Sequence, residues 1–244
     1  MGALKRDTHE TQGRIMGTRT ISVAMVLMAM ALLLVAAEAA VAYDREAAKD
    51  YAQAHALTYS SNYKSFSETT GDCANFVSQC IHEGGVAMSH SDPYWRNFKN
   101  QNNAWVVSNS WSVAYNLFDY WKTSPRSNYR SLVDTWDWLS STSRPAPPNN
   151  IPGVVRGDFL SYVTGDANNE AGFQNDWNDI DHSAIVTGLN SHPTTQGATD
   201  MQGTLVCQHT TDRYRVFWTA EDRLPAQEFR KWGYVCWRLS TSAF

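Results

Sequence analysis

The stretch from Gly71 to Gly85 constrains the fold most, because its apolar residues recur at helical spacing between residues that start and stop helices. Asp72 is a residue type that caps helix N-termini, and the pair Gly84-Gly85 can end a helix. The residues that share one helical face are Cys73, Phe76, Val77, Cys80 and Ile81. We therefore predict a helix that packs one face against another element and carries Cys73 in its first turn.

Cys73 has two interpretations at this position. A thiol in the first turn lies at the positive end of the helix dipole, among unpaired backbone N–H groups, and both favour the thiolate. Alternatively, Cys73 is one more core residue, since free cysteine is among the most buried residue types. The choice between chemistry and packing depends on whether the chain also supplies a base.

The composition fits one soluble domain with extra segments. The chain has 244 residues, 43% of them hydrophobic and 18% charged, and a formal net charge of −4. This mild acidity gives no basic stripe for nucleic acid, so we expect no nucleic-acid partner. The ten Trp and eleven Tyr residues are more typical of a filled core or a lined cleft than of sugar stacking.

Residues 1–42 have the pattern of a signal peptide. Basic residues precede an apolar run from Ile21 to Ala37, and small residues then allow cleavage after Ala39 or after Ala42. An uncleaved membrane anchor is the alternative, but the run is short for a spanning helix. We therefore expect a secreted protein, residues 43–244, that forms a single domain, is monomeric and has no membrane attachment after cleavage.

Export also permits disulfides. If Cys73 stays free for chemistry, at most one bridge can form among Cys80, Cys207 and Cys236. Because Cys207 and Cys236 both lie in strand-like segments, they are the favoured pair. The spacing of Cys and His does not resemble a zinc finger, and we expect no metal and no cofactor.

An acidic loop, Asp166–Asp181, invites comparison with a calcium site. Its start resembles an EF-hand loop, but Ala171 stands where that loop needs glycine. Trp177 stands where the closing Glu should be. A solvated loop at the rim of the site is the favoured interpretation.

Helices come first in the chain and strands second. Helical spacing is present in Arg45–Leu57, Ser110–Lys122 and Ser131–Ser140, whereas residues 86–103 look irregular. Strand-like runs follow at Gly157–Val163, His182–Leu189, Thr204–Gln208, Val216–Thr219 and Tyr234–Leu239. Short connections between these strands predict an α+β fold, with N-terminal helices packed on a C-terminal antiparallel sheet.

His182 is the histidine best placed to serve as a base. It begins a strand, where an imidazole is costly to bury without a partner. If the next strand pairs antiparallel, its end lies beside the start of the first, which makes His209 the neighbour of His182. Gln208, on the opposite face, and Asp212, in the following loop, are the alternatives for this third residue.

Several segments stand out by their order along the chain. They are Asp72-Cys73-Ala74-Asn75-Phe76-Val77-Ser78-Gln79-Cys80, Gly84-Gly85, Trp105, Gly157-Asp158-Phe159, Asp181-His182-Ser183-Ala184-Ile185-Val186-Thr187-Gly188 and Gln208-His209-Thr210-x-Asp212. Together they resemble the putative amidase domain family, of the papain-like, NlpC-type superfamily of cysteine hydrolases, from about Tyr43 to Arg238. The resemblance implies a nucleophilic cysteine at a helix start packed on a sheet, a histidine on the sheet and a polar third residue on the neighbouring strand.

This arrangement predicts amide hydrolysis through a thioester. Cys73, paired with His182, attacks the carbonyl carbon, and His209 fixes the orientation of His182. The backbone N–H of Cys73 and a donor from the upstream loop, Tyr63 or Asn62, hold the oxyanion.

Two polar residues flank the cysteine. Asp72 is assigned to the cleft beside Cys73. Its spacing from Asn75 also suits a reciprocal helix cap, so we expect both residues to shape the helix start and not to take part in the chemistry.

The expected function is therefore that of an exported cysteine amidase or peptidase. Its expected substrate is an amide or peptide, in particular cell-wall (peptidoglycan) peptide, by superfamily analogy and secretion alone. One alternative is a non-catalytic domain that binds wall components through an aromatic cleft. Another is an acyl transferase that uses the same Cys-His site and passes the acyl group to an amine.

Overall fold

The computed structural model describes residues 42–69, 71–126, 130–136, 150–163, 180–194, 202–219 and 233–241. All of them belong to one compact unit, Val41–Phe244. The predicted signal peptide up to residue 41, with its cleavage site after Ala39, lies outside the described residues, as does most of the acidic loop, 164–179. No helix in the described ranges is long and apolar enough to span a membrane.

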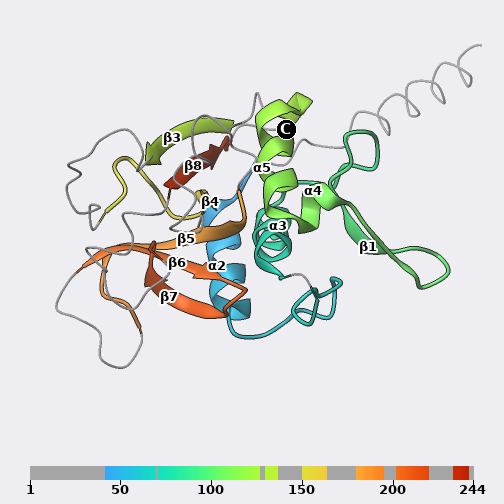
Figure 1. Cartoon of the computed structure of the whole chain (residues 1–244), viewed down its shortest axis with the longest axis horizontal. Helices are drawn as coiled ribbons and strands as arrows, with labels where there is room; N and C mark the ends of the chain where they lie inside the picture. Colours follow the sequence, from blue (N-terminus) through green and yellow to red (C-terminus); the bar gives the residue numbers. More distant parts are fainter. Residues whose placement is uncertain are drawn as a thin grey trace, which may run out of the picture. The chain divides into compact units, whose positions relative to one another are not determined.

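The fold is α+β, with helices first and an antiparallel sheet second (Figure 1). The helices are α2 (Arg45–His55), α3 (Cys73–Glu83), α4 (Asn109–Ser112) and α5 (Ala114–Thr123). The strands are β1 (Asn97–Lys99), β2 (Trp105–Val107), β3 (Arg130–Trp136), β4 (Phe159–Val163), β5 (His182–Ser191), β6 (Gly203–Gln208), β7 (Arg213–Phe217) and β8 (Gly233–Leu239). Within the described residues, β1 and β2 form a hairpin and the others form a sheet of order β3-β8-β4-β5-β6-β7, with every neighbouring pair antiparallel.

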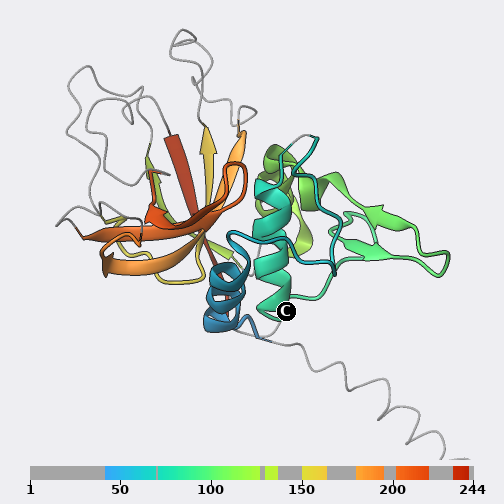
Figure 2. The same cartoon turned by 90° about the horizontal axis from the view of Figure 1, so that it is seen from below.

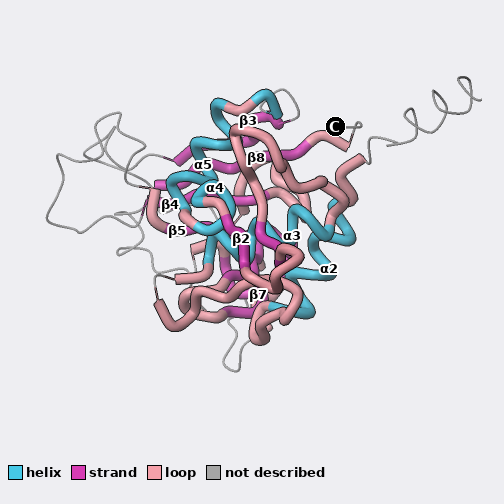
Figure 3. Tube along the Cα trace, turned by 90° about the vertical axis from the view of Figure 1, so that its right-hand side faces the viewer, coloured by secondary structure: helices cyan, strands magenta, loops and turns pink. Residues whose placement is uncertain are grey.

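Helices α2 and α3 lie side by side against β5 and β6 (Figures 2 and 3). Asp44 caps α2 as the sequence indicates, since its side chain accepts hydrogen bonds from the N–H groups of Glu46 and Ala47. Helix α3 is buried on all sides from Cys73 to Ile81. It is covered by the sheet on one side and by α2, α4 and α5 on others.

Side chains of the sheet alternate between two buried faces. Ile185 and Cys207 belong to a core cluster that also contains Phe76 and other helix residues. Ala184 and Val206, one position away, belong to a far-face cluster that contains no residue of the described helices. This period of two decides on which side of the sheet each candidate site residue lies.

The predicted helix Ser131–Ser140 is wrong. Residues 130–136 form strand β3, which pairs with β8 at the edge of the sheet. Leu132, which helical spacing placed on a buried face, is 54% exposed. Because pairing with β8 satisfies backbone groups of both strands, this tertiary interaction overrides the local helical spacing.

Two other segments differ from the prediction. The helix predicted at Ser110–Lys122 is interrupted at Val113, whose extended backbone (φ −117°, ψ 128°) separates α4 from α5. Val113 is also 42% exposed, so no packing favours a helical conformation there. Residues 86–103, expected to be irregular, contribute strand β1 of the hairpin. The five predicted strands are confirmed, with ends that differ by at most three residues.

The favoured Cys207–Cys236 disulfide is also wrong. All four cysteines are free and buried. Cys207 lies in the core cluster on the helix side of the sheet, whereas Cys236 lies in the far-face cluster. Because the sheet separates their side chains, the two sulfur atoms cannot reach bonding distance.

Candidate active site

Cys73 is the first residue of α3 and is 8% exposed. Its thiol lies 4.0 Å from the carbonyl oxygen of Asp181 and receives the backbone N–H of Ser183, so the sulfur touches the main chain on both sides of His182. Burial raises the pKa of the Cys73 thiol to about 11, and the N–H groups of Ser183 and Ala74 lower it by less. Burial is the largest of these effects, so the structure favours the protonated thiol over the expected thiolate.

Asp72 occupies the N-cap position of α3, as predicted, but its side chain makes no capping hydrogen bond. Its Oδ1 accepts from the N–H of Phe66 at 2.6 Å and from Asn75 Nδ2 at 2.9 Å, and its Oδ2 lies 2.7 Å from Nδ1 of His209. With this carboxylate engaged elsewhere, no side chain caps the first turn of α3. Backbone N–H groups at an uncapped helix start can stabilise a negative charge that develops beside Cys73.

Asn75 connects three parts of the chain instead of forming the predicted reciprocal cap. Its Oδ1 accepts from Asn97 Nδ2 at 2.9 Å and from Trp111 Nε1 at 2.8 Å. Its Nδ2 donates to the carbonyl oxygen of Lys64 and to Asp72 Oδ1, both at 2.9 Å. These four hydrogen bonds satisfy the amide completely and fix the start of α3 against β1, α4 and the preceding loop.

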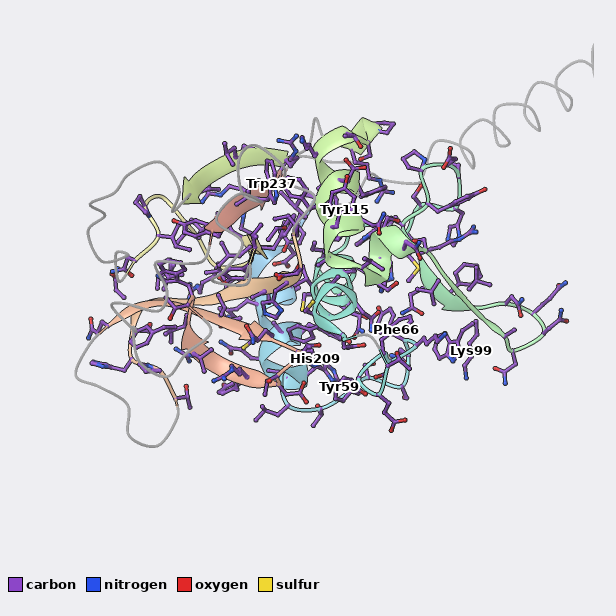
Figure 4. All side chains as sticks on the ribbon, in the orientation of Figure 1. Tyr59, Phe66, Lys99, Tyr115, His209 and Trp237 are labelled. Carbon is purple, nitrogen blue, oxygen red and sulfur yellow. The ribbon has the colours of Figure 1, made fainter. Side chains whose placement is uncertain are left out.

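His209 lies on the helix side of the sheet and is buried beside Tyr59 (Figure 4). Its Nδ1 faces Asp72, and its Nε2 lies 2.8 Å from the carbonyl oxygen of His55. Both ring nitrogens are therefore already engaged, and neither is left for another imidazole. The prediction that His209 orients His182 is corrected by these contacts.

Gln208, the alternative third residue, is the partner of His182. Nε2 of His182 lies 2.9 Å from Gln208 Oε1, and Gln208 Nε2 donates to the carbonyl oxygen of Thr211 at 3.2 Å. Because the amide nitrogen needs the Thr211 acceptor, the amide oxygen faces the imidazole and must receive an N–H. His182 therefore carries its proton on Nε2 and a lone pair on Nδ1, the form that a general base requires.

The electrostatic surroundings of His182 keep the imidazole neutral. Burial lowers its pKa below the ordinary 6.5, and the charge of Arg213 lowers it further. The hydrogen bond to Gln208 and the charge of Asp181 act in the opposite direction and do not reverse the shift. The free base is thus the main form near neutral pH.

The thiol and the imidazole approach β5 from different sides. The ring of His182 packs near Tyr162 of the far-face cluster, with ring centroids 5.5 Å apart, whereas Cys73 reaches the main chain from the helix side. Among the described contacts, no hydrogen bond joins Sγ to the imidazole. The structure places the Cys73 sulfur against the main chain that flanks His182, but it does not bring the thiol into contact with the imidazole.

The Tyr63 hydroxyl lies beside the far end of α3, too far from Cys73 to donate to an oxyanion there, and Asn62 lines the same pocket as Tyr63. The Tyr63 hydroxyl donates to Glu83, the last residue of α3. That end of the helix is about 15 Å from the first residue, at a rise of about 1.5 Å per residue. Both residues line a separate pocket of about 440 Å³, together with Lys99 of β1. Figure 4 labels the Lys99 side chain. Their assignment to the oxyanion site is corrected accordingly.

Sequence reasoning missed two residues beside the site. The hydroxyl of Thr210 accepts the Asp72 N–H at 2.6 Å, and its place in the Gln-His-Thr run was the available signal. Arg213 pairs with Gln208 across β6 and β7, and only the strand register reveals this. Asp212, the other alternative third residue, accepts from the Tyr59 hydroxyl at 2.7 Å and makes no described hydrogen bond to His182.

The chain is similar to proteins of a known family. A family profile described as "Putative amidase domain" matches residues 42–232. The "Uncharacterized protein YhbB" of Bacillus subtilis (strain 168) is 34% identical over 87 residues, which cover 34% of this chain. The match spans about a quarter of the length of that curated relative, 25%. No solved structure matches the chain.

Proposed function

The chain belongs to the putative amidase domain family, and from this premise we propose that it is a thiol amidase with Cys73 as nucleophile. His182 serves as the base in this proposal, and Gln208 holds its tautomer. The uncapped first turn of α3 binds the oxyanion. The proposed steps use only the side chains and main chain of this protein, the substrate and water.

The reaction proceeds through a thioester. Nδ1 of His182 takes the Cys73 thiol proton as the sulfur bonds to the carbonyl carbon, and the carbonyl oxygen becomes an oxyanion held by the N–H groups of α3. The imidazolium then gives its proton to the leaving amine, and the C–N bond breaks. Water, deprotonated by His182, attacks the thioester, releases the acid and restores the thiol.

One observation carries the proposal. A chain of hydrogen bonds from Thr211 through Gln208 fixes the tautomer of His182, and the thiol at an uncapped helix start touches the main chain on both sides of that histidine. A cysteine that only fills the core would need neither a nearby histidine of fixed tautomer nor a position at an uncapped helix start.

The proposal includes a movement of His182 when substrate binds. Hydrogen bonds between catalytic groups are often absent in a free enzyme and form in the substrate complex. The raised pKa of Cys73 agrees with this order of events, because a protonated thiol stays unreactive until the imidazole reaches it. His182 is the first residue of β5 and its backbone pairs with Tyr162 of β4, so the proposed movement is a rotation of the imidazole about its side-chain bonds.

We further propose that the protein acts outside the cell on an amide of cell-wall peptide. The support for export is the basic and apolar leader in residues 1–42. The papain-like, NlpC-type assignment supports a cell-wall substrate and rests on the order of the sequence motifs. Acyl transfer to an amine would use the same thioester.

A non-catalytic wall-binding domain is the second candidate. The observation in its favour is that the Cys73 thiol is buried and does not contact the imidazole of His182. If this role holds, the protein binds wall material, and replacement of Cys73 leaves that binding unchanged.

Defined muropeptides incubated with the purified protein, followed by mass analysis of the products, test these candidates. Wild type should cleave, and Cys73→Ala should lose activity by roughly a thousandfold or more. Cys80→Ala, which removes a buried thiol two turns further along α3, is the matched control and should retain activity. Full activity in Cys73→Ala would refute the mechanism. Binding to cell walls without cleavage by wild type would favour the wall-binding role, and amide products in the presence of added amine would show transfer.

A further inference from the structure

A pocket of about 420 Å³ lies at the β6–β7 turn, and the proposed steps leave it unassigned. Leu57 and Val216 supply apolar parts of its lining. Thr211, Asp212 and Arg213 supply polar parts. A concave site with a few convergent polar groups is the usual form of a ligand pocket.

Two residues of the pocket lining, Thr211 and Arg213, are neighbours of Gln208, the partner of His182. Arg213 is the register partner of Gln208, and the Gln208 amide donates to the carbonyl oxygen of Thr211, a lining residue. The positive charge of Arg213 also reaches His182, where it lowers the pKa of the imidazole. A ligand held in the pocket would therefore lie beside the residues that hold the base.

Arg213 is the cation available in this pocket. In the described part of the chain, no hydrogen bond or ion pair engages its guanidinium group. The carboxylate of Asp212, the acidic residue of the same lining, instead accepts the Tyr59 hydroxyl at 2.7 Å. A guanidinium group presents a planar fork of donors that matches a carboxylate through two parallel hydrogen bonds.

The apolar part of the lining narrows the class of ligand. Leu57 is 61% exposed, the largest exposed fraction among the large apolar residues of the described chain. A side chain of this kind at a pocket rim is suited to the aliphatic portion of a short peptide. Carboxylate and aliphatic groups occur together in an amino-acid residue that has a free carboxyl group.

We propose that Arg213 binds a free carboxylate of the substrate residue next to the scissile amide, so that acidic peptides are preferred over their neutral carboxamide analogues. The proposal names a substrate class for the site described above and rests on the proposed amidase function. Its binding component, however, requires no catalysis and can be measured without it.

Titration with N-acetyl-L-alanine and with N-acetyl-L-alanine amide, followed by NMR of the backbone amides, tests the proposal. Wild type and Cys73→Ala should both bind the acid at least roughly tenfold more tightly than the amide. The reason is that only the acid has a carboxylate that can form a charged hydrogen bond with the Arg213 guanidinium. Arg213→Gln should bring the ratio to about one. Asp212→Asn should raise the ratio, since a neighbouring negative charge is removed. Arg156→Gln, at an exposed arginine paired with Glu46, is the matched control and should leave the ratio unchanged.

Equal affinity of wild type for the two probes, or a preference for the acid that survives in Arg213→Gln, would overturn the proposal. The amidase function fails separately, if Cys73→Ala cleaves muropeptides as wild type does. When wild type does cleave, the ratio of kcat/KM for matched acid and carboxamide peptides should collapse in Arg213→Gln and persist in Arg156→Gln. Persistence of that ratio in Arg213→Gln would equally overturn the proposal.

Discussion

Nδ1 of His209 lies 2.7 Å from Oδ2 of Asp72, and both side chains are almost fully buried, 1% and 0% exposed. The next residue, Thr210, accepts the backbone N–H of Asp72 at 2.6 Å. Two consecutive residues of the β6–β7 turn thus hold the residue that precedes Cys73. The position of the proposed nucleophile depends on a contact between segments 137 residues apart.

Breaking this buried pair should destabilise the fold. Asp72→Ala and His209→Ala should each lower the free energy of unfolding by about 3–5 kcal/mol, because each removes one member of the buried pair and leaves the other unsatisfied. The double variant should lose less than the sum of the two, with a coupling of about 1–3 kcal/mol. Urea unfolding of the four proteins measures the cycle, and strictly additive losses would contradict the pairing.

The pH dependence of activity should report His182. Its neutral form is the proposed base, so kcat/KM falls as the pH decreases through the pKa of the imidazole. Because burial lowers that pKa, the acidic limb should lie below the ordinary 6.5. Gln208→Glu places a carboxylate against Nε2, which favours the imidazolium and should move the limb to higher pH. An unchanged limb in Gln208→Glu would exclude Gln208 as the partner of the base.

Alkylation should report the state of Cys73. Burial raises the pKa of its thiol to about 11, so the rate of iodoacetamide labelling in the free protein should keep increasing above pH 9. Peptide mapping distinguishes Cys73 from Cys80, Cys207 and Cys236, which are buried as well. A labelling rate that levels off below pH 8 would show a preformed thiolate, and the proposed movement of His182 would then be unnecessary.

Local sequence was sufficient for the helix that carries Cys73 and for the strand that begins at His182. In both cases the spacing of apolar residues and the flanking Asp, Gly or His residues are properties of a few neighbouring positions. The family resemblance added their order along the chain. Together, local spacing and the order of the motifs were enough to select Cys73 as the candidate nucleophile and His182 as the candidate base.

The third residue could not be chosen from sequence because His209 and Gln208 are adjacent and point to opposite faces of the sheet. The choice depends on the register between β5 and β6 and on a bulge that shifts the β6–β7 pairing after Val206. It depends also on Asp72, whose carboxylate engages His209 from a distant segment. The pKa of Cys73 is equally non-local, since it follows from how completely the sheet covers the thiol.

Gly71 offers a test of the link between the β6–β7 turn and Cys73. It has a φ of +97°, and a Cβ atom there would lie 3.2 Å from Cγ2 and Oγ1 of Thr210, the residue that accepts the Asp72 N–H. Gly153 provides the matched control, because its φ is +70° but, among the residues that the structure describes, a Cβ there would meet only Val133 Cγ1, at 3.8 Å. Both Gly→Ala variants should lose about 1–2 kcal/mol of stability through backbone strain.

Only Gly71→Ala should also displace Thr210 and with it the start of α3. We expect its kcat to fall by about tenfold or more, since small displacements of a nucleophile are costly in rate. Gly153→Ala should retain the kcat of wild type at temperatures where both variants are folded. Thermal unfolding and steady-state kinetics measured together separate the two effects. Equal kcat in the two variants would mean that the Thr210 contact does not position Cys73.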